Sequence, residues 1–351
     1  MTKIKIDSGI ATSHLRPTKL HLHITSKCTY RCKHCCSNAS SMRESTLLSL
    51  EDVKVRVLDQ AAGFGMESFE MSGGEPTLLN ENFIFEAFRH ASELGLKTTL
   101  CTNSCKLTER YASKLARSGL WRVKLSLYGT KAETHDSFTG VPGSFNRVVR
   151  GIQAAKDMGI EVWVHCVVTP FNLGEMLTVP SLLDPFGVDI VQLGSVVPVG
   201  RARALQGYQF SEEELDEVVR SFERHLSSLL HRRYFFTISL YPVLGAFPFE
   251  GRYCSYLVDR LVVDSRGDVI PCCILPTELG VIGNLRVETL QEICSLRRVE
   301  SGWVSGWLYK GHEAMQKRLE YDRTSHNLCA LCIDMFGRLY RMLDDHVRGR
   351  T

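Results

Sequence analysis

Strand-like and helix-like patterns alternate along the chain from residue 20 to about residue 210. Short apolar-rich segments predict strands at 20–25, 68–71, 98–103, 123–128, 162–169 and 190–196. Helical spacing of apolar residues predicts helices at about 50–62, 81–94, 107–118, 144–158, 174–184 and 211–231. Repeated strand–helix units of this kind predict a parallel sheet.

The alternation within the strands also predicts what each face of the sheet meets. In the first strand Leu20, Leu22 and Ile24 share one side, and His21 and His23 share the other. A doubly wound parallel sheet is apolar on both faces, so a polar face favours a barrel-like curve around a polar lumen. The expected lumen residues are His23, Glu70, Lys124, Ser126 and His165. Six units rather than eight predict a wide or incomplete barrel, although such residues could also satisfy one another inside a closed core.

The pattern changes after about residue 232. Segments 257–264 and 268–274 flank Ser265-Arg266-Gly267 and predict a hairpin, and a short helix follows at 288–297. The remainder is short and rich in cysteine, which favours a small appended domain held partly by a metal centre. The predicted division is 1–19 as an N-terminal extension, 20–232 as the barrel and 233–351 as a bridging segment and the small domain.

Composition excludes several classes of protein and points to metal. The chain has 351 residues, 44% of them hydrophobic and 23% charged, with a net charge of +3, which indicates a globular protein without a nucleic-acid or membrane partner. The N-terminus has no apolar signal core, so we expect a cytoplasmic protein. Thirteen cysteines are an odd number, and they cluster near the two ends. In a reducing compartment such clusters indicate metal sites rather than disulfides.

The first cluster directly follows the first predicted strand. Cys28-Thr-Tyr-Arg-Cys32-Lys-His-Cys35 places three thiols on one short loop. Three thiolates can hold three irons of a 4Fe–4S cluster and leave the fourth iron open to another ligand. The alternative is a zinc site with a fourth ligand from elsewhere, such as His34.

Other polar groups follow the carboxyl ends of the later strands, the edge where βα barrels place their active sites. Met71-Ser-Gly73-Gly74-Glu75-Pro76 follows the second strand; its glycines allow a ligand to approach the backbone, and Glu75 can meet an ammonium group. Further candidates at this edge come from the third to sixth strands: Asn103, Ser126, Asn172 and Arg201.

These motifs resemble the radical S-adenosylmethionine superfamily from about Leu20 to Ala204. The resemblance implies a (β/α)6 partial TIM barrel in which Cys28, Cys32 and Cys35 hold a 4Fe–4S cluster and the cofactor chelates its open iron. It implies reductive cleavage of S-adenosylmethionine to a 5′-deoxyadenosyl radical that abstracts a hydrogen atom from substrate. The implied cofactor contacts are Gly73, Gly74 and Glu75 at the methionine amino end, Asn103 and Ser126 near the ribose or carboxylate, and His34 by the adenine. Many relatives carry Arg where Thr139 stands, so Arg147 or Lys124 is left as the carboxylate partner.

The second cluster resembles the SPASM or twitch domains of the same superfamily, from about Cys254 to Phe336. No cysteine follows Cys332, a departure from full SPASM domains that favours the twitch type with one auxiliary 4Fe–4S cluster. The implied ligands of that cluster are Cys254, Cys272, Cys329 and Cys332, with zinc as the alternative.

The reaction is less constrained than the cofactors. The outcome expected is dehydrogenation, cross-linking or epimerisation of a peptide or of a sugar- or aminocyclitol-type small molecule, with Cys101 or Cys273 as candidate hydrogen donors. Only 27 residues precede Cys28, which we expect to leave no room for a leader-peptide-binding domain. A flavodoxin or ferredoxin is the expected electron donor. The alternative is a non-catalytic iron–sulfur or zinc protein that serves as an electron carrier or sensor.

Overall fold

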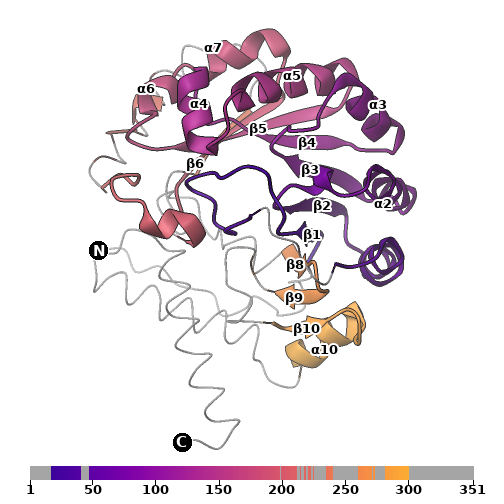
Figure 1. The fold of residues 1–351 in the computed structure, drawn as a ribbon. Coiled ribbons are helices and arrows are strands. Elements are labelled where there is room, and N and C mark those ends of the chain that lie inside the picture. The colour runs from indigo at the N-terminus through magenta and orange to yellow at the C-terminus, as the bar shows by residue number, and fades with distance from the viewer. Residues whose placement is uncertain are drawn as a thin grey trace, which may run out of the picture.

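The structure is a computed structural model that describes residues 17–40, 47–197, 199–211, 260–270, 272 and 281–299, the strand at 235–239 and single positions between 214 and 224. Figure 1 shows the described strands as one curved sheet with the described helices along its outer side. None of the described helices is both long enough and apolar enough to cross a bilayer.

The described strands form a single open sheet. Their bounds are β1 (Lys19–Thr25), β2 (Ser68–Gly73), β3 (Lys97–Thr102), β4 (Arg122–Ser126), β5 (Glu161–Val168), β6 (Ile190–Ser195), β7 (Phe235–Ser239), β8 (Arg260–Asp264), β9 (Asp268–Ile270) and β10 (Gly283–Asn284). Their order is β10-β9-β8-β1-β2-β3-β4-β5-β6-β7. Strands β1 to β7 are parallel, and β8 is parallel to β1, whereas β9 and β10 pair antiparallel. The open parallel sheet confirms the predicted partial barrel.

Helices connect most of the parallel strands. They are α1 (Asp59–Gly63), α2 (Glu81–Glu93), α3 (Glu109–Arg117), α4 (Ala132–Thr139), α5 (Ser144–Asp157), α6 (Leu173–Met176), α7 (Val179–Leu183) and α10 (Leu290–Val299). A π-helix (η2, Asp52–Leu58) precedes α1, and 3-10 turns occur at η3 (Pro76–Leu78), η4 (Asp184–Phe186) and η5 (Gly200–Ala204). The helix expected at 211–231 lies mostly outside the described residues, although described positions between 214 and 224 are helical.

The six predicted strands agree with the structure to within two residues, one predicted helix needs correction, and one helix of the structure has no predicted counterpart. The helix expected at 174–184 is broken into α6 and α7, because Pro180 has no amide hydrogen and fits only the first turn of a new helix. Helix α4 was not predicted, since only His135, Phe138 and Thr139 of its residues are buried. The left-handed Gly140 (φ 68°) that ends it was the available signal.

The hairpin around Gly267 is confirmed, but its strands belong to the barrel sheet. Gly267 has a φ of +90°, as a tight turn requires. Leu20 of β1 is in register with Leu261 of β8, whose neighbours are largely buried. At the opposite edge β7 pairs with β6. The sheet therefore continues at both edges beyond the six predicted units and past the expected boundary near residue 232.

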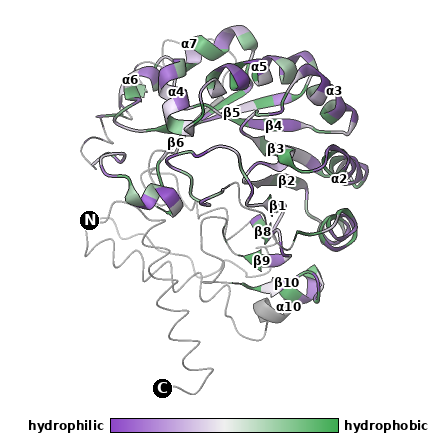
Figure 2. Cartoon of the chain, viewed as in Figure 1, coloured by the Kyte–Doolittle hydropathy of each residue, from purple (hydrophilic) through white to green (hydrophobic). Residues whose placement is uncertain are grey.

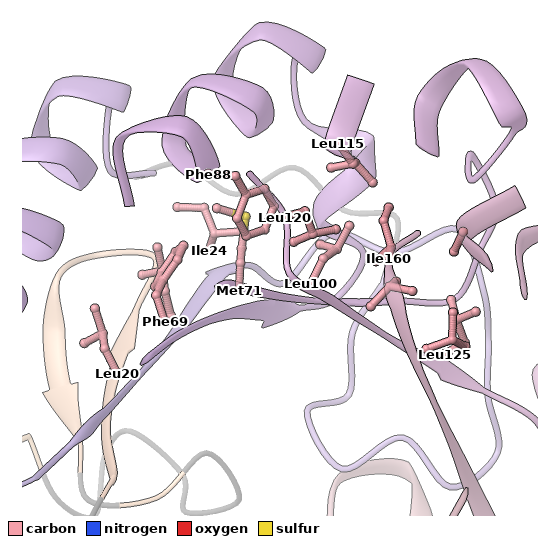
Figure 3. Close-up of a cluster of buried hydrophobic side chains, with 14 of the residues drawn as sticks. Leu20, Ile24, Phe69, Met71, Phe88, Leu100, Leu115, Leu120, Leu125 and Ile160 are labelled. Atoms are coloured by element: carbon pink, nitrogen blue, oxygen red, sulfur yellow. The ribbon is translucent and has the colours of Figure 1, made fainter. Parts of the chain in front are cut away.

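The two faces of the sheet differ as the alternation predicts. Apolar side chains of one face, such as Leu20, Met71, Leu100 and Leu125, point toward the helices and are fully or almost fully buried (Figure 3). The helices that cover them carry both hydrophobic and hydrophilic residues (Figure 2). The opposite side of the sheet, here called the inner face, carries the polar residues His23, Glu70, Lys124, Ser126 and His165.

Candidate active site

The cysteine loop, residues 26–40, leaves the carboxyl end of β1. A bridge between Lys27 and Ser40 closes its base, where the Cys28 amide donates to the Ser40 carbonyl at 2.7 Å and the Ser40 amide donates to the Ser26 carbonyl at 3.1 Å. All three cysteines of the motif therefore project from one loop with fixed ends.

The three thiols of the cysteine loop lie close enough to influence one another. Burial, then the Glu75 carboxylate and then the Cys35 thiol raise the pKa of Cys28. Burial followed by both other thiols raises the pKa of Cys32 to about 12. The Tyr30 amide (3.4 Å) and the Asn103 side-chain amide (3.6 Å) both donate to the Cys28 sulfur. Amide donors of this kind stabilise a metal-bound thiolate.

This donor set fits an iron–sulfur cluster, because three soft thiols come from one short loop and interact electrostatically, and N–H groups donate to one of them. Within the described residues, no group of three or more His, Cys, Asp or Glu side chains converges closely enough to hold a single metal ion.

The glycine turn after β2 lies against the start of the cysteine loop. The Gly74 amide donates to the Thr25 carbonyl at 2.6 Å, and the Glu75 amide donates to the Lys27 carbonyl at 2.8 Å. Gly73 has a φ of +126°, and a Cβ there would collide with the Thr25 backbone, as one on Gly74 would collide with the Lys27 carbonyl. Only glycine allows the two segments to approach this closely.

The carboxylate of Glu75 is completely buried and is bonded to neighbouring residues. Its Oε1 accepts from the Thr77 amide (3.0 Å), the Thr77 hydroxyl (2.5 Å) and the Thr102 hydroxyl (2.7 Å), and its Oε2 accepts from the Asn103 amide (2.7 Å). Burial raises the pKa of Glu75, and these four donors oppose that shift. These bonds join the ends of β2 and β3.

Asn103 and Ser126 follow β3 and end β4, at the same edge of the sheet. Asn103 connects the glycine turn to the cysteine loop, because its amide donates to Glu75 while its side chain donates to Cys28. The Ser126 side chain bonds the hydroxyl of Tyr128 and is in register with His165 on β5.

Aromatic side chains gather beside the cysteine loop. The His34 ring meets Tyr128 edge-on with ring centroids 4.4 Å apart and lies 5.9 Å from Phe138. Tyr128 also stacks on His135 with an interplanar angle of 17°. Burial lowers the pKa of His34 to about 3, so its ring is neutral. Neither Tyr128 nor Phe138 is among the cofactor contacts expected from the sequence.

The structure separates the two candidates for a carboxylate partner. Lys124 is ion-paired with Glu70 at 2.6 Å on the inner face. Arg147, on α5, instead lies by Tyr30 of the cysteine loop, and its interaction with the Tyr30 hydroxyl raises the pKa of Arg147. Of the two cations, Arg147 is the one beside the cysteine loop.

The inner face holds a network of ionisable groups around Glu70. Besides Lys124, the carboxylate meets Arg260 at 3.7 Å, His21 at 3.5 Å and the Cys101 thiol at 3.5 Å. Burial opposes ionisation of Glu70, but the nearby positive groups outweigh it and lower its pKa.

Cys101 therefore lies on the inner face beside a carboxylate, where burial raises the pKa of its thiol. His23 and His165 are neutral there, because burial lowers the pKa of each to about 4.

Most of the second cysteine set lies outside the described residues, including the expected ligands Cys254, Cys329 and Cys332 and the candidate hydrogen donor Cys273. Cys272 is described, is half-buried and interacts electrostatically with Cys36 of the cysteine loop. One expected auxiliary ligand therefore lies near the first motif.

Comparisons with known proteins agree with this arrangement. The family profile of the radical SAM superfamily matches residues 22–179, and that of the iron–sulfur cluster-binding SPASM domain matches residues 254–333. The first domain binds a 4Fe–4S cluster and S-adenosylmethionine, and the second binds auxiliary iron–sulfur clusters.

Named relatives match part or most of the chain. An AdoMet-dependent heme synthase of Oleidesulfovibrio alaskensis is 31% identical over 57% of this chain, and the match spans 50% of that relative. A protein of the same name from Methanosarcina barkeri is 26% identical over 79% of this chain and 82% of its own length. Streptococcus suis SuiB bound to its precursor peptide SuiA shares the fold, with a TM-score of 0.65 and 18% identity over 79% of this chain and 64% of SuiB. This chain belongs to the radical S-adenosylmethionine superfamily and carries a SPASM-type iron–sulfur domain.

Proposed function

We propose that this protein is a radical oxidoreductase or maturase in which Cys28, Cys32 and Cys35 hold the cluster that binds S-adenosylmethionine. When bound, that cluster would supply one electron to the sulfonium of S-adenosylmethionine, whose broken C–S bond gives methionine and a 5′-deoxyadenosyl radical that takes a hydrogen atom from a carbon of the substrate. The observation that carries the proposal is the meeting of the cysteine loop, the glycine turn and an aromatic group at one edge of the sheet.

The residues of this edge suit the parts of S-adenosylmethionine. The methionine amino group is expected at the backbone of Gly73, Gly74 and Glu75, because the Glu75 carboxylate is already occupied by four donors. Arg147 is the better carboxylate partner, since Lys124 is paired with Glu70.

The adenine and ribose find suitable neighbours at the same edge. The neutral His34 ring and the faces of Tyr128 and Phe138 suit a flat, uncharged adenine. Asn103 and Ser126 offer polar groups for the ribose or carboxylate at the ends of β3 and β4.

The SPASM-type domain suggests the second half of the reaction. We assign Cys254, Cys272, Cys329 and Cys332 to one auxiliary 4Fe–4S cluster, and four thiolates would leave none of its irons open to substrate. Such a cluster suits the removal of a second electron from the product radical, so we favour dehydrogenation or cross-linking over epimerisation. The electron for the first cluster would come from a flavodoxin or ferredoxin.

We favour a small-molecule substrate over a peptide. The support is the Methanosarcina barkeri heme synthase, which matches most of this chain and most of its own length. The inner face carries several ionised side chains, including Glu70, Lys124 and Arg122, which suit a polar substrate. The likeness to peptide-bound SuiB keeps a peptide as the second class to test.

Anaerobic reconstitution tests the cofactor assignment. Wild-type protein should bind about eight irons per chain if two cubane clusters are present. Adding S-adenosylmethionine should change the electron paramagnetic resonance spectrum of the reduced protein. The Cys28→Ala/Cys32→Ala/Cys35→Ala variant should lose that response and about half of the iron. Stoichiometric zinc without iron–sulfur absorbance would instead support the non-catalytic alternative.

A further inference from the structure

We propose that Arg201 is a positioning residue that holds the cysteine loop in its cluster-binding conformation and places a permanent positive charge beside the cluster. The inference rests on the proposed role of Cys28, Cys32 and Cys35 as cluster ligands. It adds a residue of the segment after β6, 199–204, to the machinery around that cluster.

Arg201 makes four hydrogen bonds to the cysteine loop. Its amide donates to the Cys35 carbonyl at 3.0 Å, and its Nε donates to the Cys32 carbonyl at 2.9 Å. Its Nη1 donates to the Ala39 carbonyl at 2.6 Å and to the Asn38 side chain at 3.3 Å. One residue thus holds the backbone at two of the three predicted ligands and also the returning end of the loop.

The cysteine loop has little internal structure that could replace these bonds. Between its closed base residues it contains short turns but no described helix or strand. Asn38 adopts a left-handed conformation with a φ of 50°, which residues other than glycine seldom adopt and which Asn tolerates better than most. The bonds from Arg201 to Asn38 and to the next residue stabilise this part of the loop.

The backbone of the 199–204 segment allows it to lie close to the cysteine loop. Gly200 has a φ of +58°, and a Cβ there would collide with the carbonyls of Cys35 and Cys36. Only glycine lets the following Arg201 amide reach the loop.

The loop is held from another side by the end of α4. The Arg31 amide donates to the Thr139 carbonyl and the Lys33 amide donates to the Phe138 carbonyl, each at 2.9 Å. These bonds involve only backbone atoms at the positions between the cysteines, so they carry no charge to the ligands. The Lys33 ammonium also donates to the Ser137 hydroxyl of α4 at 2.9 Å, between two of the cysteines. Arg201 differs from these contacts because its cationic side chain donates to the carbonyl of a predicted ligand, Cys32, and its charge acts on that thiol.

A guanidinium suits both parts of the proposed role. Its planar fork can donate to several carbonyls at once, whereas a lysine ammonium offers one compact point of contact. A positive charge close to a cluster also favours the reduced form, which is more negative, and so raises the reduction potential.

The experiment compares Arg201→Gln, which loses both the charge and the fork, with Arg201→Lys, which keeps the charge. Arg203→Gln is the matched control, because Arg203 is an exposed arginine on the same short segment. Three quantities are measured: amide exchange of residues 28–40 in the metal-free protein, iron loss from the reconstituted full chain to a chelator, and the midpoint potential of the cluster that responds to S-adenosylmethionine.

Loss of charge-assisted hydrogen bonds should make Arg201→Gln lose iron about tenfold faster than wild type. Its loop amides should exchange faster, and its midpoint potential should become more negative. Arg201→Lys should keep the wild-type potential while its loop amides still exchange faster. Arg203→Gln should match wild type throughout.

Equal amide exchange and iron loss in Arg201→Gln and Arg203→Gln would overturn the positioning role. A potential lowered equally in Arg201→Lys and Arg201→Gln would overturn the charge effect. If the Gln variant folds poorly, a midpoint potential of Arg201→Lys below that of wild type would overturn it alone. Failure of the proposed function would give a different result from failure of this inference. In that case the Cys28→Ala/Cys32→Ala/Cys35→Ala variant would keep the electron paramagnetic resonance response to S-adenosylmethionine.

Discussion

The buried carboxylate of Glu75 offers a direct test of how the edge of the sheet is held together. Replacing Glu75 by Gln keeps the shape of the side chain but turns one acceptor oxygen into an NH₂ group. In the favourable orientation the three donors from Thr77 and Thr102 still meet an oxygen. The new NH₂ group then faces the Asn103 amide, which in the wild-type protein donates to Glu75 at 2.7 Å and in the variant has no acceptor there. The flipped orientation is worse, because the NH₂ group would then face three donors.

The size of the effect follows from these four bonds. A hydrogen bond to a charged group contributes about 1.5–3 kcal/mol, and a buried donor left without an acceptor costs about 1–3 kcal/mol. The three surviving bonds also weaken as they lose their charge. Because a neutral amide is cheaper to bury than a carboxylate, part of this loss is offset. We therefore expect Glu75→Gln to lower the free energy of unfolding by about 2–4 kcal/mol.

Urea unfolding of the metal-free protein measures this loss, with Glu93→Gln as the control. Glu93 is an exposed glutamate at the end of α2, so its substitution should change stability by less than about 0.5 kcal/mol. Reconstituted Glu75→Gln should also hold iron more weakly, since Asn103 donates to the Cys28 sulfur. If Glu75→Gln unfolds at the same urea concentration as the control, the four bonds do not stabilise the edge and the reasoning is refuted.

Three other sites give predictions of the same kind. Gly73→Ala should destabilise the metal-free protein by about 2 kcal/mol or more in urea, whereas Gly63→Ala, with open space around the new Cβ, should stay within about 0.5 kcal/mol; equal effects would contradict the close approach at the turn. His135 has its pKa lowered to about 4 by burial, so the folded state resists its protonation and stability should fall as pH drops from about 6.5 to 4, by up to about 1.4 kcal/mol per unit. His135→Phe should reduce the slope by that amount and leave the part due to the other buried histidines, such as His23, His34 and His165; an unchanged slope would argue against the assignment. Lys124→Met should cost about 2–4 kcal/mol by leaving Glu70 short of a partner, and adding Glu70→Gln should restore part of it in a double-mutant cycle; strict additivity would contradict the pairing.

The local sequence pattern predicted those strands in which buried apolar and polar residues alternate. The alternation of Leu20, His21 and Leu22 predicted both the strand and the face that meets the helices, because side chains on a strand alternate sides. The same local signal cannot report on a pairing partner far along the chain. The parallel pairing of Leu20 with Leu261, which brings β8 into the barrel sheet, is therefore invisible until the structure is known.

In the candidate site, too, features that depend on neighbouring residues were predicted and features that depend on distant residues were not. Cysteine spacing predicted the loop, and the glycines predicted the close turn, since both depend on neighbouring residues. The role of Glu75 could not be predicted, because its bonding partners Thr102 and Asn103 come from another strand. The sequence places Arg201 only among the polar residues at the barrel edge, because the residues that it bonds in the cysteine loop lie more than 160 positions earlier in the chain.

The central claim is that Cys28, Cys32 and Cys35 hold the cluster at which S-adenosylmethionine is cleaved. The most direct measurement is 5′-deoxyadenosine formed from S-adenosylmethionine and dithionite by the anaerobically reconstituted full chain. Wild-type protein should form it, the Cys28→Ala/Cys32→Ala/Cys35→Ala variant should form none, and a Cys166→Ala control, which changes a cysteine of the apolar core, should still form it. Continued formation of 5′-deoxyadenosine by the triple variant would contradict the account.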